Sequence, residues 1–446
     1  MVKHAEIKKS SHDSIPSDFD DMPTTLEDLF HISLEHNYSG TILTLFSHGI
    51  DINSRDIEGR TAIHYLAAAS CKNILEFLIR KGADINARDN NNNTALHFGI
   101  LESVDFPVTT SRSAVNTETI KFLVSQGIDI NVRNNNGITA LHIAIKRNDK
   151  EIIDYLISHG ANATLRDNNN KTALHYAAIN ESKGILDLII SHGVEINSRD
   201  NDNKTALHYA ADFKRKGAIG FLISHGADIN AKDNDNQTPL YLSLKKQMNT
   251  FPWDPLKNQN EERNLYDIIE YFISHGADIN SKDKDGKIAI HLASSLGILR
   301  IVELIVSNGT DINAKDNNGK TALHYAAELN SKEIAEFLIS QGADINIKDN
   351  NNKTVLHYAV ERNEMEFISY LISHGLDVNA RDNDDNTVLH FAVTGDKEPT
   401  KFFVSKWNQN NKSNKIEFPV SKWNQNNKSN KIEFLISKGV DNQCQK

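Results

Sequence analysis

The sequence of 446 residues predicts an all-α fold, a solenoid in which about eleven copies of one helical repeat are stacked. A block, Thr-Ala-Leu-His, returns at a fixed step of 33 residues, and a glycine returns in the same phase. Two short apolar segments between them have the spacing of helices. Because such self-similarity means that one supersecondary unit recurs, a residue found in every repeat is interpreted as framework. Exact copies of the block include those that begin at Thr139, Thr172, Thr205 and Thr321.

The first helix of the repeat follows a polar turn. In the repeat that starts at Asp167, the sequence Asp-Asn-Asn-Asn-Lys precedes Thr172, whose hydroxyl can accept a free backbone N–H at a helix start. A helix is therefore predicted from Ala173. The equivalent Thr238 is followed by Pro239, which suits the first helical position. Gly, Asn or Asp stands three residues after each turn aspartate, which predicts a β-turn with a left-handed residue.

The second helix is predicted from Lys183 to Ser191, where isoleucine and leucine form a wide apolar face. Gly193 follows it, and glycine occupies this position in all eleven repeats, from Gly49 to Gly439. A helix that ends in a left-handed residue favours glycine there. Residues 194–200 are then expected to run extended into the next turn.

This turn–helix–helix repeat, with its Thr-x-Leu-His and Gly-Ala-Asp-Ile-Asn blocks, resembles the ankyrin repeat over most of residues 28–440. Ala or Val usually stands where that family prefers Pro, and Asn often replaces the turn Gly. Tyr241 replaces one histidine, and Ile288 replaces one capping threonine. The resemblance implies an ankyrin solenoid joined by β-turn or hairpin loops, in which turn tips and first helices line a concave face that binds partner proteins.

The predicted organisation is a polar, disordered tail at 1–24, the repeat array at 25–440 and a short tail at 441–446. Insertions at about 102–115 and 246–262 lengthen two steps to 45 and 50 residues, and the array carries a duplicated segment at 404–434. Each interruption fits either a tolerated surface loop or a partner-contact loop. The contact interpretation is best for 246–262, which places Phe251 and Trp253 between prolines.

Composition bounds the class of protein. The net charge of −10 opposes a nucleic-acid-binding surface, which normally carries a basic stripe. Cys71 and Cys444, the two cysteines, fit a reducing compartment without a disulfide framework. No apolar run approaches the roughly 20 residues of a membrane helix, and no apolar signal segment follows Met1. We expect an intracellular protein, cytoplasmic or nuclear, that is a monomeric array without direct membrane insertion.

Neither catalysis nor metal binding is predicted. Sixteen of the nineteen histidines fall in the Thr-x-Leu-His block or just before the repeated glycine, so they are interpreted as framework. The acidic turns lack the glutamate that closes an EF-hand loop. The sequence contains no phosphate-binding loop, nucleophile elbow, kinase signature or Cys-x-x-Cys. We therefore expect no enzyme activity, no cofactor and no metal.

The repeats differ at the positions seven and eight after the threonine, and these variable positions are the candidates for determining which partner binds. We place the binding hypothesis in a groove around residues 139–246, where four basic side chains flank Phe213 on an otherwise acidic chain. Variation at these positions fits drift on a solvated surface equally well. Together with the second insertion, these positions give the candidate partner-binding residues Lys146, Arg147, Asp212, Phe213, Lys245, Lys246, Trp253, Glu328, Glu361 and Arg362.

Two further patterns recur. The position four after the threonine is almost always aromatic or aliphatic, which fits packing between first helices or, alternatively, a solvated tyrosine ladder. The asparagine-rich turn tips are interpreted as compositional bias without a function. The aromatic stripe contains Tyr65, Phe98, Ile143, Tyr176, Tyr209, Leu242, Leu292, Tyr325, Tyr358 and Phe391.

The predicted function is that of a scaffold or adaptor that binds other proteins. Two alternatives remain open. One is a substrate receptor that recruits an enzyme such as a ubiquitin ligase, although no recruitment domain is visible in the sequence. The other is an inert or decaying copy of a repeat protein, which the identical C-terminal duplication makes plausible.

Overall fold

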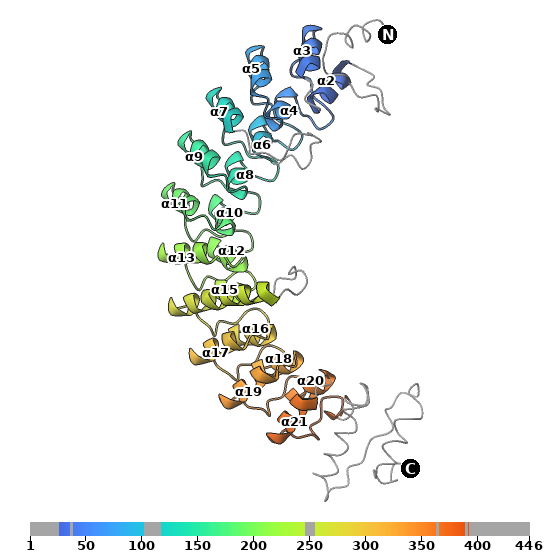
Figure 1. The fold of residues 1–446 in the computed structure, drawn as a ribbon, viewed down its shortest axis with the longest axis vertical. Coiled ribbons are helices and arrows are strands. Elements are labelled where there is room, and N and C mark those ends of the chain that lie inside the picture. The colour runs from blue at the N-terminus through green and yellow to red at the C-terminus, as the bar shows by residue number, and fades with distance from the viewer. Residues whose placement is uncertain are drawn as a thin grey trace, which may run out of the picture. The chain divides into compact units, whose positions relative to one another are not determined.

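The computed structural model of the chain describes residues 26–35, 39–101, 117–245, 255–362, 365–388 and 391. The chain forms two compact units, Met1–Asn234 and Asp235–Lys446, which we call the N-terminal and C-terminal units. In the described residues every regular element is a helix, which confirms the all-α prediction (Figure 1). Within these ranges, no helix has both the length and the apolar character needed to cross a membrane.

Helices alternate as first and second members of each repeat. In the N-terminal unit the first helices are α2 (Leu26–Glu35), α4 (Ala62–Ala68), α6 (Ala95–Ile100), α8 (Ala140–Lys146), α10 (Ala173–Asn180) and α12 (Ala206–Asp212). Their partners are α3 (Ser39–Ser47), α5 (Lys72–Arg80), α7 (Thr117–Ser125), α9 (Lys150–Ser158), α11 (Lys183–Ser191) and α13 (Lys216–Ser224). In the C-terminal unit the first helices are α14 (Pro239–Leu244), α16 (Ala289–Leu296), α18 (Ala322–Glu328) and α20 (Val355–Arg362). Their partners are α15 (Pro255–Ser274), α17 (Leu299–Ser307), α19 (Lys332–Ser340) and α21 (Met365–Ser373).

The repeat has the predicted local structure. Helix α10 begins at Ala173, and α11 spans the predicted Lys183–Ser191 with Ile185, Leu186 and Ile189 in the core. The turn residue Asn170 has a φ of 62°, and Gly193 has a φ of 84°. Both positions need the left-handed region, so the restriction to Gly, Asn or Asp has a backbone cause.

A histidine completes the cap of each typical first helix. In α10 the backbone N–H of Thr172 donates to Nδ1 of His175 at 3.0 Å, and the threonine Oγ1 lies 3.0 Å from the same nitrogen. Since Nδ1 accepts, the proton of the neutral ring lies on Nε2. That N–H donates to the backbone oxygen of Lys204 in the next repeat at 3.1 Å. One buried ring therefore caps its own helix and joins two repeats.

The same bridge recurs at other first helices of the N-terminal unit, and the Nδ1 cap recurs in both compact units. The histidines of this group lie in the core, with at most 1% of their surface exposed. The Nε2 bonds to the following repeat join His64 to Asn93 at 3.2 Å and His97 to Ile138 at 3.1 Å. In the C-terminal unit Nε2 of His291 instead bonds to the backbone oxygen of Ala314, at the end of its own repeat, at 3.0 Å.

The asparagine-rich turn tips are structural, so their interpretation as compositional bias without a function is wrong. The Nδ2 of Asn168 donates to the backbone oxygen of Asn135 at 2.7 Å, and its backbone N–H donates to that of Asn136 at 3.0 Å. Asparagine is favoured because its short amide side chain reaches one backbone carbonyl of the preceding tip while its own backbone N–H reaches the next. The Nδ2 bond also occurs at Asn90, Asn135, Asn201, Asn234, Asn317, Asn350 and Asn383.

A second row of asparagines ends the Gly-Ala-Asp-Ile-Asn block. The Nδ2 of Asn197 donates to the backbone oxygen of Gly226 at 3.3 Å, and its Oδ1 accepts the backbone N–H of Asp228 at 2.8 Å. Asn131 bonds in the same way to Gly160 and Asn162. An amide is needed here because only a side chain with both a donor and an acceptor satisfies the two backbone groups.

The other repeated histidines close the second helices, as the sequence suggested. His159 follows α9, and its Nδ1 lies 2.8 Å from the backbone oxygen of Tyr155 while the two rings stack at 4.0 Å. His225 and His275 repeat this arrangement on Phe221 and Tyr271. These exposed rings satisfy carbonyl groups at helix ends.

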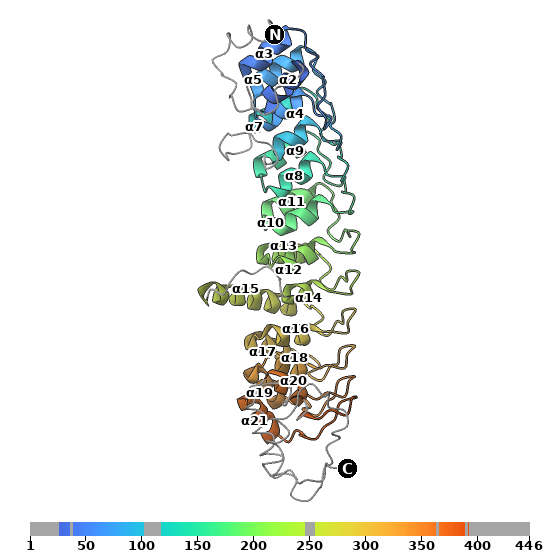
Figure 2. The same ribbon diagram turned by 90° about the vertical axis from the view of Figure 1, so that its right-hand side faces the viewer.

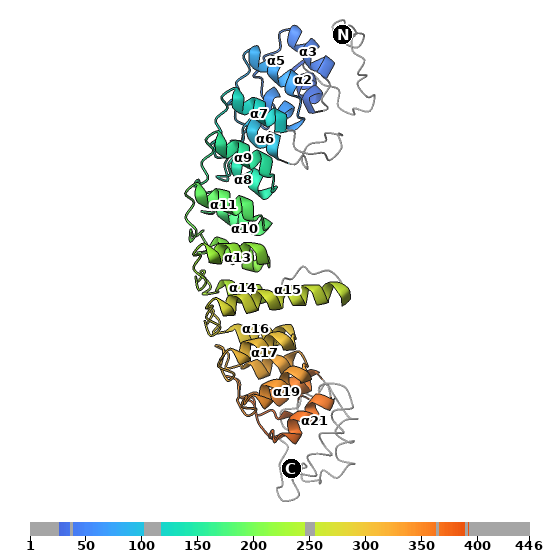
Figure 3. The same cartoon turned by 60° about the vertical axis from the view of Figure 1, so that its left-hand side comes forward.

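The second insertion is partly helical. Residues 255–262, which the sequence suggested as part of a loop, belong to α15, a helix of 20 residues where the other second helices have 9. Figures 2 and 3 show α15 extending past its neighbour α17. Pro255 stands at the first helical position, where its missing N–H costs nothing. The insertion at 102–115, residues 246–254, the duplicated segment and both predicted tails lie outside the described residues.

Replacing His175 by alanine is expected to destabilise the chain by about 2–4 kcal/mol, because one change removes a helix cap and one of the two donors to the Lys204 carbonyl. His192→Ala is the matched control, since its ring is exposed and bonds only to the end of α11. We expect it to cost less than about 1 kcal/mol. Urea denaturation followed by circular dichroism measures both, and equal losses would contradict the bridging role.

The buried histidines also predict a loss of stability in mild acid. Burial lowers the pKa of this group below the ordinary 6.5, to about 4 for His142 and for His324. Protonation therefore favours the unfolded chain, so their stabilisation is fully present above about pH 6.5 and is lost as the pH falls toward 4. The lowered pKa is shared by His64, His97, His142, His175, His291, His324 and His357.

Urea midpoints measured between about pH 5 and 8 test this expectation, because ordinary carboxylates stay ionised in that interval. The midpoint should be nearly constant above pH 7 and should fall below pH 6.5. A midpoint that stayed constant down to pH 5 would show that the histidines do not control stability.

Candidate protein-binding surface

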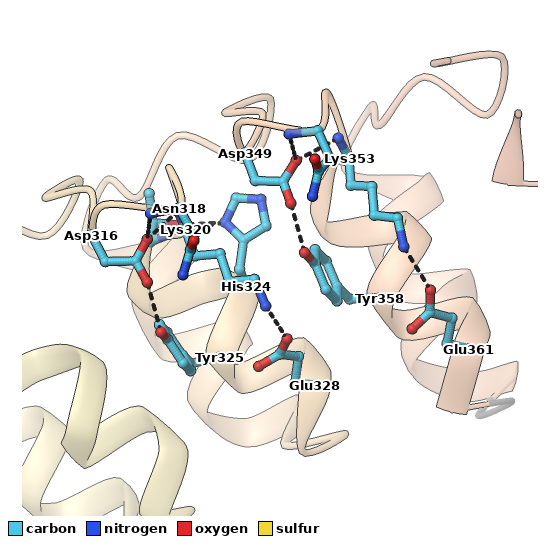
Figure 4. Close-up of polar contacts among 12 residues, drawn as sticks. Asp316, Asn318, Lys320, His324, Tyr325, Glu328, Asp349, Lys353, Tyr358 and Glu361 are labelled. Atoms are coloured by element: carbon cyan, nitrogen blue, oxygen red, sulfur yellow. Dashed lines mark hydrogen bonds and ion pairs between the residues drawn. The ribbon is translucent and has the colours of Figure 1, made fainter. Parts of the chain in front are cut away.

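The surface of interest is formed by first helices and the turns that precede them. We call it the first-helix face. In the N-terminal unit it comprises Lys146, Lys171, Tyr176, Lys204, Tyr209, Asp212 and Phe213, on α8, α10, α12 and their turns. In the C-terminal unit it comprises Lys320, Tyr325, Glu328, Lys353, Tyr358 and Glu361, on α18, α20 and their turns (Figure 4). Neighbouring first helices pack against one another in each compact unit, so these side chains follow one another along the stack.

The tyrosines of this face are tied to the turn aspartates. The hydroxyl of Tyr209 donates to Oδ2 of Asp200 at 2.6 Å, and Oδ1 accepts the backbone N–H groups of Asp202 at 2.9 Å and Lys204 at 2.8 Å. Asp200 is 5% exposed, so three donors stabilise a buried carboxylate. Burial, followed by the bond to Asp200, raises the pKa of Tyr209 well above its ordinary 10. The same arrangement occurs at Tyr176 with Asp167, Tyr325 with Asp316 and Tyr358 with Asp349.

These contacts favour the packing interpretation of the aromatic stripe over a solvated ladder. The ring of Tyr209 meets the ring of His175 edge to face at 5.7 Å, and Tyr358 meets His324 at the same distance. Such pairs stabilise adjacent first helices beyond the area they bury. With the hydroxyl bonded to aspartate and one edge against histidine, most of each ring belongs to the framework.

Lysines cover the remaining ring surface. The Nζ of Lys146 lies 4.7 Å from the centroid of Tyr176, and Nζ of Lys171 lies 4.7 Å from that of Tyr209. Lys320 lies 4.7 Å from Tyr358 in the C-terminal unit. Each is a cation–π contact from one repeat to the ring of the next.

The repeats differ in how these lysines are neutralised. In the C-terminal unit Lys320 and Lys353 pair with Glu328 at 2.5 Å and Glu361 at 3.0 Å (Figure 4). The position equivalent to these glutamates is Ile179 or Asp212 in the N-terminal unit. Among the described residues, Lys146, Lys171 and Lys204 have no carboxylate oxygen within 4.0 Å.

The structure places the predicted partner-binding residues unevenly. Lys146 and Phe213 are exposed at the ends of α8 and α12, with Phe213 42% exposed. Arg147 and Asp212 are half-buried beside them. Glu328 and Glu361 are held by the lysines of their own turns.

The remaining candidates lie apart from this group. Lys245 follows α14 and Arg362 ends α20, and both are exposed in the C-terminal unit. Lys246 and Trp253 lie outside the described residues. The groove hypothesis for 139–246, which draws on both compact units, stays a prediction.

Sequence reasoning missed Lys171 and Lys204, which immediately precede the capping threonines. A signal was present, because this position is also basic at Arg60, Lys287, Lys320 and Lys353. Because a basic residue recurs at this position, the position is interpreted as framework from the sequence alone. Only the identity of the residue eight positions later shows whether the lysine is neutralised within its own repeat.

Comparison with known families is consistent with this geometry. A family model described as ankyrin repeats, in three copies, matches residues 30–106, 111–200, 186–251, 260–349 and 347–415. A search of curated proteins finds no match.

Loss of the hydrogen bond from tyrosine to aspartate should lower the free energy of unfolding measurably. Tyr209→Phe is expected to destabilise the chain by about 1–3 kcal/mol, because the buried Asp200 carboxylate loses one of three donors. Tyr155→Phe is the control, since its hydroxyl makes a longer bond of 3.3 Å to the backbone oxygen of Lys121, and less than about 1 kcal/mol is expected. Urea denaturation compares the two. An unchanged stability of Tyr209→Phe would show that the hydroxyl does not stabilise the fold, and it would then be a candidate group for partner contact.

Proposed function

This chain belongs to the ankyrin repeat family, whose repeats generally act as protein–protein interaction modules, and we propose that it is a non-catalytic scaffold or adaptor. One observation carries the proposal. The residues that recur in each repeat make bonds within the framework, whereas the exposed residues at the ends of first helices change from repeat to repeat.

The chemistry of the face supports binding over catalysis. Its buried histidines and aspartates serve as caps and turn acceptors, and its tyrosine hydroxyls donate to those aspartates. In the N-terminal unit Lys146 and the ring of Phe213 are exposed, and Lys171 and Lys204 are half-buried beside them. An exposed aromatic ring is typical of contact surfaces. We propose that the chain works inside the cell as a monomeric array, with other proteins as partners and Phe213 near the centre of the contact.

A site-specific photocrosslinker tests this function. Incorporated in place of Phe213 in the full chain and expressed in the native cell, it should yield a reproducible set of crosslinked proteins. The same group in place of Lys183, which is exposed at the start of α11 on the second-helix side, is the control and should yield few.

Three outcomes are informative. A discrete set of partners specific to position 213 supports an adaptor, and a set dominated by ubiquitin-ligase subunits supports the receptor alternative. Background alone from both positions would contradict a binding function and would fit an inert repeat array.

A further inference from the structure

The first-helix face of the N-terminal unit carries cationic groups that no carboxylate of the described residues neutralises. Lys146 is exposed, and Lys171 and Lys204 are half-buried at the preceding turns. Lys146 and Lys171 lie against tyrosine rings at 4.7 Å, which holds their ammonium groups at the surface in defined positions. A cation held in place loses little further conformational entropy when it meets an anion.

The C-terminal unit shows what neutralisation looks like in the same framework. There, the equivalent turn lysines Lys320 and Lys353 already bond to Glu328 and Glu361. In the N-terminal unit Lys171 is aligned with Ile179, which has no charge. Lys204 is aligned with Asp212, whose side chain is one methylene shorter than that of glutamate, and among the described residues Lys204 has no carboxylate oxygen within 4.0 Å. The difference lies in side chains alone, since the backbone repeat is the same.

Apolar surface lies beside these lysines. Tyr209 of α12 and Phe213, which caps the C-terminal end of that helix, are four residues apart and so lie on one side of it, and the ring of Phe213 is 42% exposed. Ile179, near the end of α10, is half-buried. Lysines on one side and an aromatic residue at the helix end together form a strip with both charge and apolar character.

We propose that Lys146, Lys171, Lys204, Tyr209 and Phe213, which we call the lysine strip, bind an extended acidic segment of a partner protein. The proposal rests on the proposed binding function and adds the chemistry of the partner. Carboxylates of the segment would pair with the three ammonium groups, and an apolar side chain would cover Phe213. Charge complementarity of this kind sets specificity and association rate.

The repeat spacing sets the register of such a segment. Adjacent packed helices lie about 8–10 Å apart, and an extended chain advances about 3.3 Å per residue, so one repeat corresponds to about three residues. Acidic residues at every third position therefore match successive lysines of the strip. A segment with its carboxylates clustered would reach one lysine and leave the others unpaired.

A protein segment fits better than a nucleic acid. The chain has a net charge of −10, and Glu181 and Asp202 are exposed on the same repeats. A continuous phosphate backbone would meet these carboxylates, whereas a peptide can place its charges selectively. The tyrosine rings are also covered by lysine and bonded to aspartate, so they are not free to stack on bases.

Synthetic peptides of about twelve residues and the full chain test the proposal by fluorescence anisotropy. One peptide carries glutamate at every third position and a leucine near one end, one has the same composition with the glutamates clustered, and one has lysine in place of glutamate. We expect the every-third peptide to bind at least about tenfold more tightly than either of the others, and its affinity to fall with added salt.

The double variant Lys171→Glu with Lys204→Glu should weaken this binding by at least about tenfold. Lys150→Glu with Lys183→Glu makes the same charge change at exposed starts of α9 and α11 and should change it less than about twofold. Circular dichroism and urea denaturation of each variant establish that the fold is retained. If both double variants weakened peptide binding equally, the effect would come from net charge alone and the proposal would be wrong.

Other results would also overturn it. A dT12 oligonucleotide that bound more tightly than the acidic peptide would assign the strip to nucleic acid. Concentration-dependent self-association that the Lys171→Glu and Lys204→Glu pair abolished would assign it to a second copy of this chain. If no acidic peptide bound while the crosslinker at 213 still captured partners, the proposal of an acidic partner segment would be wrong and the proposed binding function would stand. If no acidic peptide bound and the crosslinker at 213 captured no partner, both the acidic-peptide proposal and the binding function would be wrong.

Discussion

The fold depends on one buried imidazole ring per typical repeat. Nδ1 of His175 accepts the first free N–H of its own helix, and this fixes the proton on Nε2, which then donates to the next repeat. A local cap and a contact between neighbours are therefore the same side chain in one tautomer. Stability in such a stack comes from each repeat and its nearest neighbours, so this ring contributes to both terms.

The asparagine rows extend this logic to the surface. Asn197 uses both the donor and the acceptor of its amide, and Asn168 uses its donor, to satisfy backbone groups that no strand or helix would otherwise pair. The buried turn aspartates also satisfy backbone groups. Asp200 accepts two backbone N–H groups and the hydroxyl of Tyr209. Polar residues are thus consumed by the framework to an unusual degree, and a partner is left with the few side chains that vary.

Much of this architecture was predictable because its causes are local. A positive φ at Asn170 and Gly193, the start of α10 and the length of α11 follow from short-range preferences that the sequence repeats. The asparagine rows were missed because each amide bonds across about 33 residues, and nothing in a single repeat displays that contact. The helical start of α15 was missed for a different reason, since the broken period hid a proline in a good first position.

The binding surface was the least predictable part, because it depends on how two side chains combine in one repeat. A lysine before the threonine has the same backbone setting in both compact units, and its charge is neutralised when the eighth residue after it is Glu328. With Asp212 in that position the carboxylate is one methylene short, and with Ile179 there is no charge at all. Since these exchanges leave the caps and both asparagine rows intact, a repeat array can change the charge it presents without changing its fold. The property that selects a partner can therefore vary one position at a time, while the property that keeps the chain folded is fixed by residues that recur.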